Sequence, residues 1–326
     1  MIKRMLSYVL TSFVITGCIA LGLIASDRPK PLEPTQGLDF TTAMGQDLSQ
    51  VIDTTPVLMR DGSEMAVRLY GAAGADQPLI VLVHGSGWHG MQIDGLARGL
   101  ADHARVLVPD LRGHGANPER RGDVDYIGQM EDDLADLITV QAQPTQKIAM
   151  LGHSSGGGLV VRFAGGEHGG MLDRAVLLAP FLKYNAPTTR QDAGGWAHTM
   201  VRRIIGLSML NTFKITTLNH LPIIQFNMPQ AVLDGAYGHT ATTQYSYRLN
   251  AGFAPRGDYM TDIAALPKFS LIVGTKDEAF FAHEYEPLMR QATGKGRYLL
   301  VEGEGHLPIV DAPETLAAIK EDLSGL

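Results

Sequence analysis

The stretch Lys147-Ile148-Ala149-Met150-Leu151-Gly152-His153-Ser154-Ser155-Gly156 decides the fold of this chain. An apolar run leads into the pattern G-x-S-x-G, which is typical of a buried strand that turns sharply into a helix. Such a turn holds the Ser154 hydroxyl clear of the backbone, and both glycines are needed because a Cβ atom would crowd the turn. Backbone N–H groups at the start of the helix favour a developing negative charge. We therefore predict that Ser154 is a nucleophile.

From about residue 56, strand-like apolar runs alternate with helix-like stretches. The runs cover residues 78–83, 105–109, 147–151, 175–179, 269–273 and 298–301. Continuous apolar runs of this length are typical of strands that are buried on both faces of a parallel sheet. An Asp61-Gly62 pair between two further strand-like runs predicts a hairpin ahead of them. The alternation predicts an α/β fold with a mostly parallel sheet, helices on both faces and right-handed crossovers.

One interval, residues 181 to about 266, breaks this alternation. It is rich in methionine, aromatic and aliphatic residues, among them Trp196, Met200, Phe213 and Phe226. A long insertion in a compact fold is usually functional, and this one would lie above the carboxyl ends of the strands, where open α/β sheets bind ligands. We predict a mainly helical cap. Most of its apolar side chains should form the core of the cap, and some should line an acyl-binding pocket.

A serine nucleophile needs a base, and the base needs a carboxylate that orients it. Asp277 and His306 each follow a strand-like run near the end of the chain. Because the carboxyl ends of parallel strands meet at one edge of a sheet, both residues should lie beside Ser154. Asp262 and Asp311 are rival carboxylates, but neither closes an apolar strand. We predict that Ser154, His306 and Asp277 are the nucleophile, the base and the orienting acid.

An anionic intermediate on the serine also needs N–H donors. One donor is predicted to be the backbone N–H of Ser155, which directly follows the nucleophile. The second is assigned to the N–H of Ser86, in the loop His84-Gly85-Ser86-Gly87-Trp88 after a buried strand. The ring of His84 is expected to orient this loop and to transfer no proton.

Two other polar motifs are interpreted as structural. Residues 110–115 follow the next strand and are expected to form a turn with buried polar bonds. The acidic group Glu131, Asp132, Asp133 and Asp136 lies mostly opposite the apolar side of a helix-like stretch, which is typical of a solvated helix face. We therefore expect neither a metal site nor a cofactor site.

The first 26 residues are a separate apolar segment. Lys3 and Arg4 precede a run without charge that, as a helix, would be about 33 Å long and would cross a hydrocarbon core. An uncleaved anchor with its N-terminus inside fits the two basic residues and places the rest of the chain on the extracytoplasmic, periplasmic side. A removed signal sequence, which gives a secreted form, and a lipoprotein modified at Cys18 are the alternatives.

Residues 27–55 are predicted to be a proline-stiffened linker, which leaves residues 56–326 for the folded domain. The net charge of −7 argues against a nucleic-acid partner. Cys18 is the single cysteine of the sequence, which excludes disulfides and thiol chemistry in that domain. The apolar N-terminal segment indicates that the protein binds a membrane.

With these residues in place, the chain resembles the α/β-hydrolase superfamily from about residue 56 to its end. The resemblance rests on motifs in the order of that family, namely residues 84–87, 110–115, 152–156, Asp277 and His306. Within the superfamily the chain is similar to the monoglyceride lipase, lysophospholipase and serine aminopeptidase group, because of the Leu178-Ala179-Pro180 strand end and the cap that follows it. This resemblance implies an eight-stranded sheet and hydrolysis of lipid-like or small carboxylic esters through an acyl-serine, without metal or cofactor.

Other functions fit the same residues. An amidase or peptidase would change the leaving group, and an acyltransferase would exclude water. A catalytically silent binding protein with a hydrolase fold is a further alternative. The acyl chain, the alcohol and any protein partner are left open by the sequence.

Overall fold

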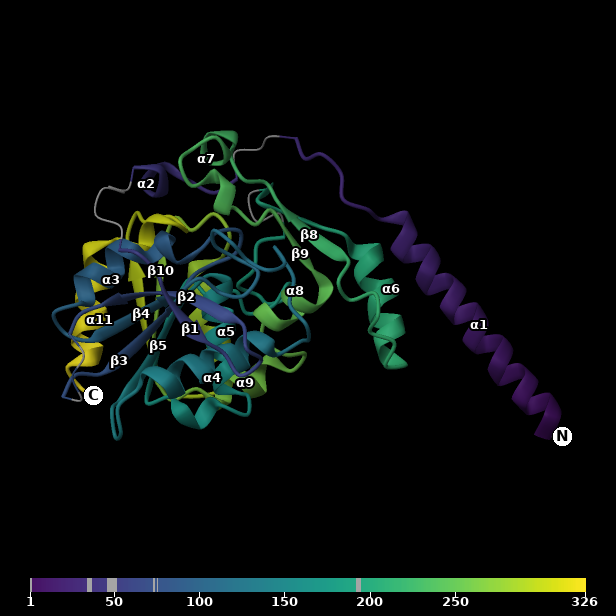
Figure 1. The fold of residues 1–326 in the computed structure, drawn as a ribbon, viewed down its shortest axis with the longest axis horizontal. Coiled ribbons are helices and arrows are strands. Elements are labelled where there is room, and N and C mark those ends of the chain that lie inside the picture. Colours follow the sequence, from purple (N-terminus) through teal and green to yellow (C-terminus); the bar gives the residue numbers. More distant parts are fainter. Residues whose placement is uncertain (1, 34–36, 46–51, 73, 75, 192–194) are drawn as a thin grey trace.

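A sheet of eight strands lies at the centre of the structure, in the order β1-β2-β4-β3-β5-β6-β10-β11 (Figure 1). The computed structural model describes residues 2–33, 37–45, 52–72, 74, 76–191 and 195–326, so parts of the predicted linker and cap lie outside the described residues. The strands are β1 (Thr55–Leu58), β2 (Glu64–Tyr70), β3 (Leu79–Val83), β4 (Arg105–Pro109), β5 (Ile148–His153), β6 (Arg174–Leu178), β10 (Lys268–Gly274) and β11 (Gly296–Val301). Strand β2 pairs antiparallel with β1 and β4, and all other pairs are parallel. The predicted α/β fold is confirmed.

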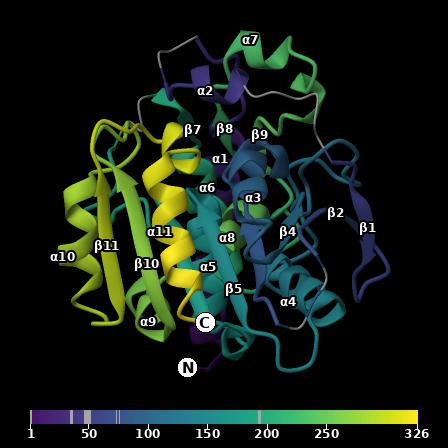
Figure 2. The same cartoon turned by 90° about the vertical axis from the view of Figure 1, so that its left-hand side faces the viewer.

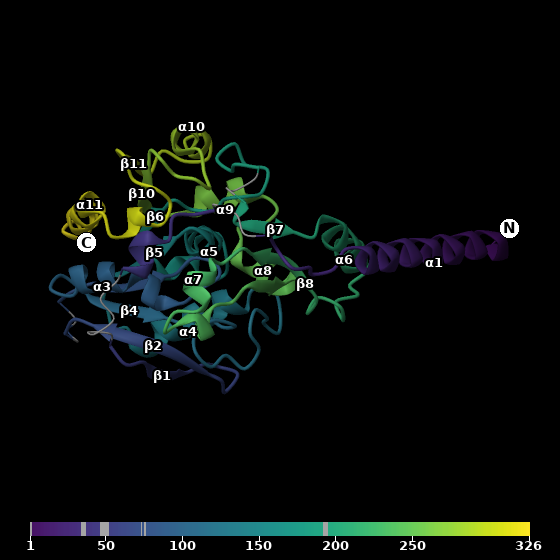
Figure 3. The same ribbon diagram turned by 90° about the horizontal axis from the view of Figure 1, so that it is seen from above.

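Helices cover both faces of the sheet because successive strand residues point to opposite sides. Ile80 and Leu82 of β3 share an apolar cluster with helices on one face, whereas Val81 and Val83 face the helices on the other. Figure 3 shows α3 and α11 on one side of the sheet and α4, α5 and α10 on the other. These helices are α3 (Asp94–Leu100), α4 (Gln129–Gln141), α5 (Ser155–Ala164), α10 (Tyr285–Met289) and α11 (Pro313–Leu323).

The cap follows β6 and combines helices with a small sheet. Its elements are β7 (Ala197–Thr199), α6 (Val201–Thr212), β8 (Pro222–Phe226), α7 (Gln230–Leu233), β9 (Gln244–Ser246) and α8 (Tyr247–Phe253), and α9 (Tyr259–Ala265) leads back to the core. The three strands pair antiparallel in the order β7-β8-β9. The helices agree with the predicted cap, but the sheet was not predicted. Two of its strands have three residues each, which is too short for an alternating pattern to be seen in the sequence.

The N-terminal helix α1 (Ile2–Ser26) projects from the cap and lies beside α6 (Figure 1). Ala20 and Ile24 are buried there in a cluster with Leu207, Leu210 and Ile223. The two helices touch closely, since a Cβ atom on Gly206 would lie 2.5 Å from the carbonyl oxygen of Ala20. Among the described residues, α1 is the one helix long and apolar enough to cross a membrane.

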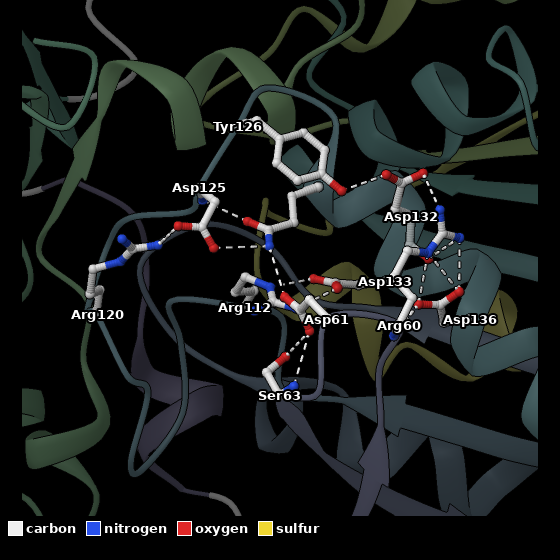
Figure 4. A network of polar contacts seen from close by, with 11 residues as sticks. Arg60, Asp61, Ser63, Arg112, Arg120, Asp125, Tyr126, Asp132, Asp133 and Asp136 are labelled. Atoms are coloured by element: carbon white, nitrogen blue, oxygen red, sulfur yellow. Dashed lines mark hydrogen bonds and ion pairs between the residues drawn. The ribbon is translucent and has the colours of Figure 1, made fainter. Parts of the chain in front are cut away.

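A network of ion pairs holds the β1–β2 hairpin against α4 (Figure 4). The Arg112 guanidinium donates to both carboxylate oxygens of Asp133, at 2.8 and 2.7 Å, and lies 3.0 Å from Asp61. Asp133 and Glu131 are buried, so the expectation of a solvated acidic face was wrong for these two residues. Arginines from other parts of the chain reach them, which the periodicity of one helix cannot reveal.

Candidate active site

Ser154 lies in the sharp turn between β5 and α5. Its φ of 55° and ψ of −120° are unusual for a residue with a side chain, and such strained backbone is typical of functional sites. A Cβ atom on Gly152 would lie 2.4 Å from the backbone of Gly156, and one on Gly156 would lie 2.3 Å from the Val83 carbonyl oxygen. The two glycines therefore permit the close approach of β3, β5 and α5 that this turn requires.

The structure brings His306 and Asp277 next to Ser154. Asp277 follows β10 and His306 follows β11, so both loops leave the same edge of the sheet as the turn after β5. The His306 Nε2 atom lies 3.0 Å from Ser154 Oγ, and His306 Nδ1 lies 2.8 Å from Asp277 Oδ2. Asp277 and His306 are each only 2% exposed. Both distances are within hydrogen-bond range, which is the geometry that a serine nucleophile, a base and an orienting carboxylate require.

The surroundings of Asp277 favour its charged form. Burial raises the pKa of this carboxyl. His306 and the hydrogen bonds to the carboxylate lower the pKa by more than burial raises it, so the net pKa lies below the usual value. The N–H groups of Ala279 and Phe280 donate to Oδ1 at 2.8 and 2.7 Å. The ionised Asp277 can only accept from His306, so His306 Nδ1 carries a proton. The Nε2 atom is then free to accept the Ser154 proton.

Two neighbours that the sequence analysis missed hold the backbone of His306. The His153 ring contacts the His306 carbonyl oxygen through Nε2 at 2.8 Å, and Glu278 Oε2 accepts from the His306 N–H at 2.7 Å. Burial lowers the pKa of His153 to about 3, so this imidazole is neutral and Nε2 carries the donated proton. His153 occupies the variable position of G-x-S-x-G, and its role depends on a residue 153 positions away.

The rival carboxylates lie elsewhere. Asp262 Oδ1 pairs with the Arg256 guanidinium at 2.8 Å, and its Oδ2 accepts from the Arg256 N–H. Asp311 lies beside Gly95, where a Cβ atom would meet its Oδ1 at 2.5 Å. The carboxylate in contact with His306 is that of Asp277.

Ser86 and Ser155, the two predicted N–H donors, lie together beside Ser154. Their hydroxyl oxygens are 2.5 Å apart, so the loop after β3 faces the start of α5. A Cβ atom on Gly85 would lie 3.3 Å from Ser154 Cβ, which shows how closely this loop passes the turn. Ser155 is the first residue of α5, and the first N–H groups of a helix have no partner within it.

A tyrosine of the cap holds this loop. The Gly87 N–H donates to the Tyr245 hydroxyl at 2.7 Å, and the same hydroxyl lies 2.6 Å from His114 Nε2. His114 Nδ1 faces the Arg112 carbonyl oxygen at 3.0 Å and must donate to it, so Nε2 accepts from Tyr245. Burial raises the pKa of Tyr245 and lowers that of His114, so both groups are neutral. Tyr245 was missed because it comes from β9 of the unpredicted sheet.

A small cavity lies over Ser154. It is lined by the turn and the loop already described, and also by apolar side chains of the cap and of the N-terminal segment, namely Trp196, Met228, Leu38 and Phe40. Trp196 belongs to the apolar set from which the sequence analysis expected pocket residues. Leu38 and Phe40 were missed because the segment that contains them was interpreted as a linker. Among the described residues, no group of His, Cys, Asp or Glu side chains is arranged to hold a metal ion.

Known proteins resemble the chain over most of its length. An uncharacterized protein of Mycobacterium tuberculosis is 26% identical over 86% of this chain and 85% of its own length. A soluble variant of monoglyceride lipase from Saccharomyces cerevisiae has a similar structure, with a TM-score of 0.62 and 15% identity, over 86% of this chain and 96% of that one. A membrane phospholipase A described as a bacterial virulence factor gives a TM-score of 0.60 at 18% identity, over 100% of this chain and 99% of that one.

A family model agrees with these structural likenesses. It is described as the alpha/beta hydrolase family and matches residues 80–319, which include Ser86, Ser154, Asp277 and His306. The order of the strands, the turn after β5 and the match over most of the sequence lead to one assignment. The chain belongs to the alpha/beta hydrolase family.

Proposed function

We propose that this protein is a serine hydrolase that cleaves carboxylic esters through an acyl-serine intermediate. The observation that carries the proposal is the continuous contact from Asp277 Oδ2 to His306 Nδ1 and from His306 Nε2 to Ser154 Oγ. The solved structures described as an esterase and as a monoglyceride lipase support the ester as substrate class.

The reaction has two steps of the same kind. His306 Nε2 takes the Ser154 proton as Oγ bonds to the ester carbonyl carbon, and the N–H groups of Ser86 and Ser155 stabilise the resulting oxyanion. The intermediate then expels the alcohol, which receives the proton from His306. Water attacks the acyl-serine as it gives a proton to His306. The second intermediate then releases the carboxylic acid while His306 returns this proton to Ser154 Oγ, which restores the free enzyme. Asp277 stays ionised and stabilises the imidazolium in both steps.

An activity panel tests the substrate class. p-Nitrophenyl esters of graded chain length, aminoacyl p-nitroanilides and an added alcohol as acyl acceptor distinguish an esterase from an amidase and from an acyltransferase. We expect turnover of the esters, a carboxylic acid as the product, and labelling of the protein by a fluorophosphonate. Preferential cleavage of the anilides would indicate an amidase. A protein that neither hydrolyses the esters nor reacts with the fluorophosphonate would be a binding protein without catalytic activity.

We further infer that α1 is retained as a membrane anchor, with the hydrolase domain on the extracytoplasmic side. Ala20 and Ile24 pack into the cap, and the Arg203 guanidinium donates to the Ile24 carbonyl oxygen at 3.3 Å. Removal of α1 would expose Leu207 and Leu210 of α6 to water. Cys18, the alternative lipidation site, is exposed within the continuous helix α1.

Gly206→Leu is expected to lower the melting temperature of the detergent-solubilised full chain by several degrees. The new side chain would begin 2.5 Å from the Ala20 carbonyl oxygen and would force α1 and α6 apart. Gly22→Leu in α1 is the matched control, because nothing lies within 4 Å of its Cβ position. Equal melting temperatures for the two variants, measured by differential scanning fluorimetry, would contradict the packing of α1 on the cap.

Tyr245→Phe is expected to lower kcat for p-nitrophenyl butyrate about tenfold or more while KM changes little. Loss of the hydroxyl leaves the Gly87 N–H and His114 Nε2 without partners, and the loop that carries Ser86 loses its fixed position. Tyr70→Phe is the control, since this buried tyrosine bonds Asp94 on the far side of the sheet. Steady-state kinetics that show the same kcat in both variants would exclude a role for Tyr245 in positioning this loop.

A further inference from the structure

The segment between α1 and β1 is bound to the cap. The Lys30 N–H donates to Gln225 Oε1 at 3.0 Å, and Gln225 Nε2 donates back to the Lys30 carbonyl oxygen at 2.9 Å. Asn227 Nδ2 donates to the Glu33 carbonyl oxygen at 2.8 Å. Gln225 belongs to β8 and Asn227 follows it, so the chain leaves α1 along the sheet of the cap. Specific hydrogen bonds to the cap therefore fix the position of this segment ahead of the residues that lie at the Ser154 edge of the sheet.

Residues 37–45, called the strap below, then lie over the candidate active site. They include the short helix α2 (Thr41–Met44), which Figures 1 and 2 show close to α7 of the cap. Leu38 is 8% exposed and Phe40 is 5% exposed, which is unusual burial for a connecting segment. The Phe40 ring centroid lies 6.2 Å from that of Trp88 and 5.4 Å from that of Trp196. Phe40 thus lies between the loop after β3 and the cap.

Leu38 and Phe40 line the same cavity as Ser154 and His306. An acyl group on Ser154 Oγ must begin in this cavity, whose other apolar walls are Trp88, Trp196, Met228 and Leu307. The cavity has a volume of about 10 Å³, measured as the space open to the centre of a water molecule, so it has room for about one water. A chain of several methylene groups therefore cannot enter while the side chains of the strap keep these positions.

We propose that Leu38 and Phe40 occupy the acyl-chain site of this hydrolase and so determine which acyl lengths it accepts. A short acyl group needs little of the space that they fill, whereas a longer chain must displace them. Their apolar side chains are matched to apolar walls, so the ligand that replaces them is a hydrocarbon chain. The inference rests on the ester hydrolase function proposed above.

The strap lies within the segment that leads from the apolar helix α1 to the sheet. The hydrogen bonds between Lys30 and Gln225 of β8, and the packing of α1 on α6, link the position of Phe40 to the N-terminal segment. The proposal thus assigns selectivity for the acyl chain to residues of the N-terminal segment. These residues precede residue 56, where the sequence analysis placed the start of the hydrolase domain. The cap supplies Trp196 and Met228 to the wall of the same cavity.

Phe40→Ala and Leu38→Ala in the full chain test this assignment. The measurement is the ratio of kcat/KM for p-nitrophenyl octanoate to that for p-nitrophenyl acetate. We expect this ratio to rise about tenfold or more in Phe40→Ala and by a smaller factor in Leu38→Ala, because the freed volume accepts further methylene groups. Met44→Ala is the matched control, since Met44 lies in the same strap but is 50% exposed, and its ratio should equal that of the wild type.

Each outcome bears on the proposal. A ratio that is unchanged or falls in both Phe40→Ala and Leu38→Ala, with acetate still hydrolysed, overturns it. Phe40→Leu keeps an apolar side chain, so its ratio should lie between those of the wild type and Phe40→Ala. Because this smaller change is less disruptive to folding, it tests the proposal even if Phe40→Ala folds poorly. If the ester hydrolase function itself is wrong, the wild type will neither hydrolyse the acetate nor react with fluorophosphonate, so the two failures are distinguishable.

Discussion

Ser154→Ala is expected to reduce p-nitrophenyl ester turnover by about 10⁶-fold and to abolish labelling by a fluorophosphonate. The alanine removes the Oγ atom that His306 Nε2 contacts at 3.0 Å, so no covalent acyl or phosphonyl bond can form at this position. Steady-state kinetics and in-gel fluorescence of the labelled protein measure the two losses. The fold should persist, because the strained turn is held by the glycines and by β3 rather than by the hydroxyl.

Ser270→Ala is a suitable control for this variant. Ser270 is a buried serine of β10 in the same sheet, far from the turn after β5 in the chain, and its replacement should leave labelling intact. Labelling that persists in Ser154→Ala would show that the nucleophile is another residue. That result would disprove the proposed acyl intermediate on Ser154, even if the activity panel shows ester hydrolysis.

Asp277→Asn is expected to lower kcat by about 10⁴-fold with only a small change in KM. The wild-type carboxylate accepts the Nδ1 proton of His306, whereas an asparagine amide in the same place can donate to Nδ1. The imidazole proton would then move to Nε2, which faces Ser154, and His306 would no longer accept the serine proton. The lowered pKa of Asp277 means that the wild-type carboxylate stays ionised through neutral and mildly acidic pH.

Asp262→Asn separates this effect from the general loss of a buried carboxylate. Asp262 is as buried as Asp277 but pairs with Arg256, so its replacement should lower the melting temperature and leave kcat nearly unchanged. A loss of kcat in Asp262→Asn comparable to that in Asp277→Asn would mean that the assignment of the orienting acid is wrong.

The sequence predicted the residues that meet at the edge of the sheet, and the reason is topological. Ser154, Asp277 and His306 each follow an apolar strand, and parallel strands place their carboxyl ends at one edge. Once the strands were identified from their apolar runs, the proximity of three distant residues followed without further information. The distances of 3.0 and 2.8 Å required the structure.

Other parts of the candidate site have no comparable pattern. Tyr245 reaches the loop after β3 from a three-residue strand of the cap, and a single tyrosine carries no periodic signal. His153 was visible within G-x-S-x-G, but its contact with the His306 carbonyl oxygen depends on how β5 and the loop after β11 approach each other. Such contacts between loops are not encoded in local propensity.

By itself, the sequence determined the strand order along the chain, the turn at Ser154 and the candidate base and acid, because each depends on local apolar patterning and on the shared edge of parallel strands. Tertiary structure alone decided where the cap and the strap lie. Leu38 and Phe40 look like linker residues in the sequence, and they become walls of the cavity only because Trp88 and Trp196 lie beside Phe40. The burial of an isolated side chain depends on what other segments place against it, and neither its own residue type nor its neighbours in the chain specify that.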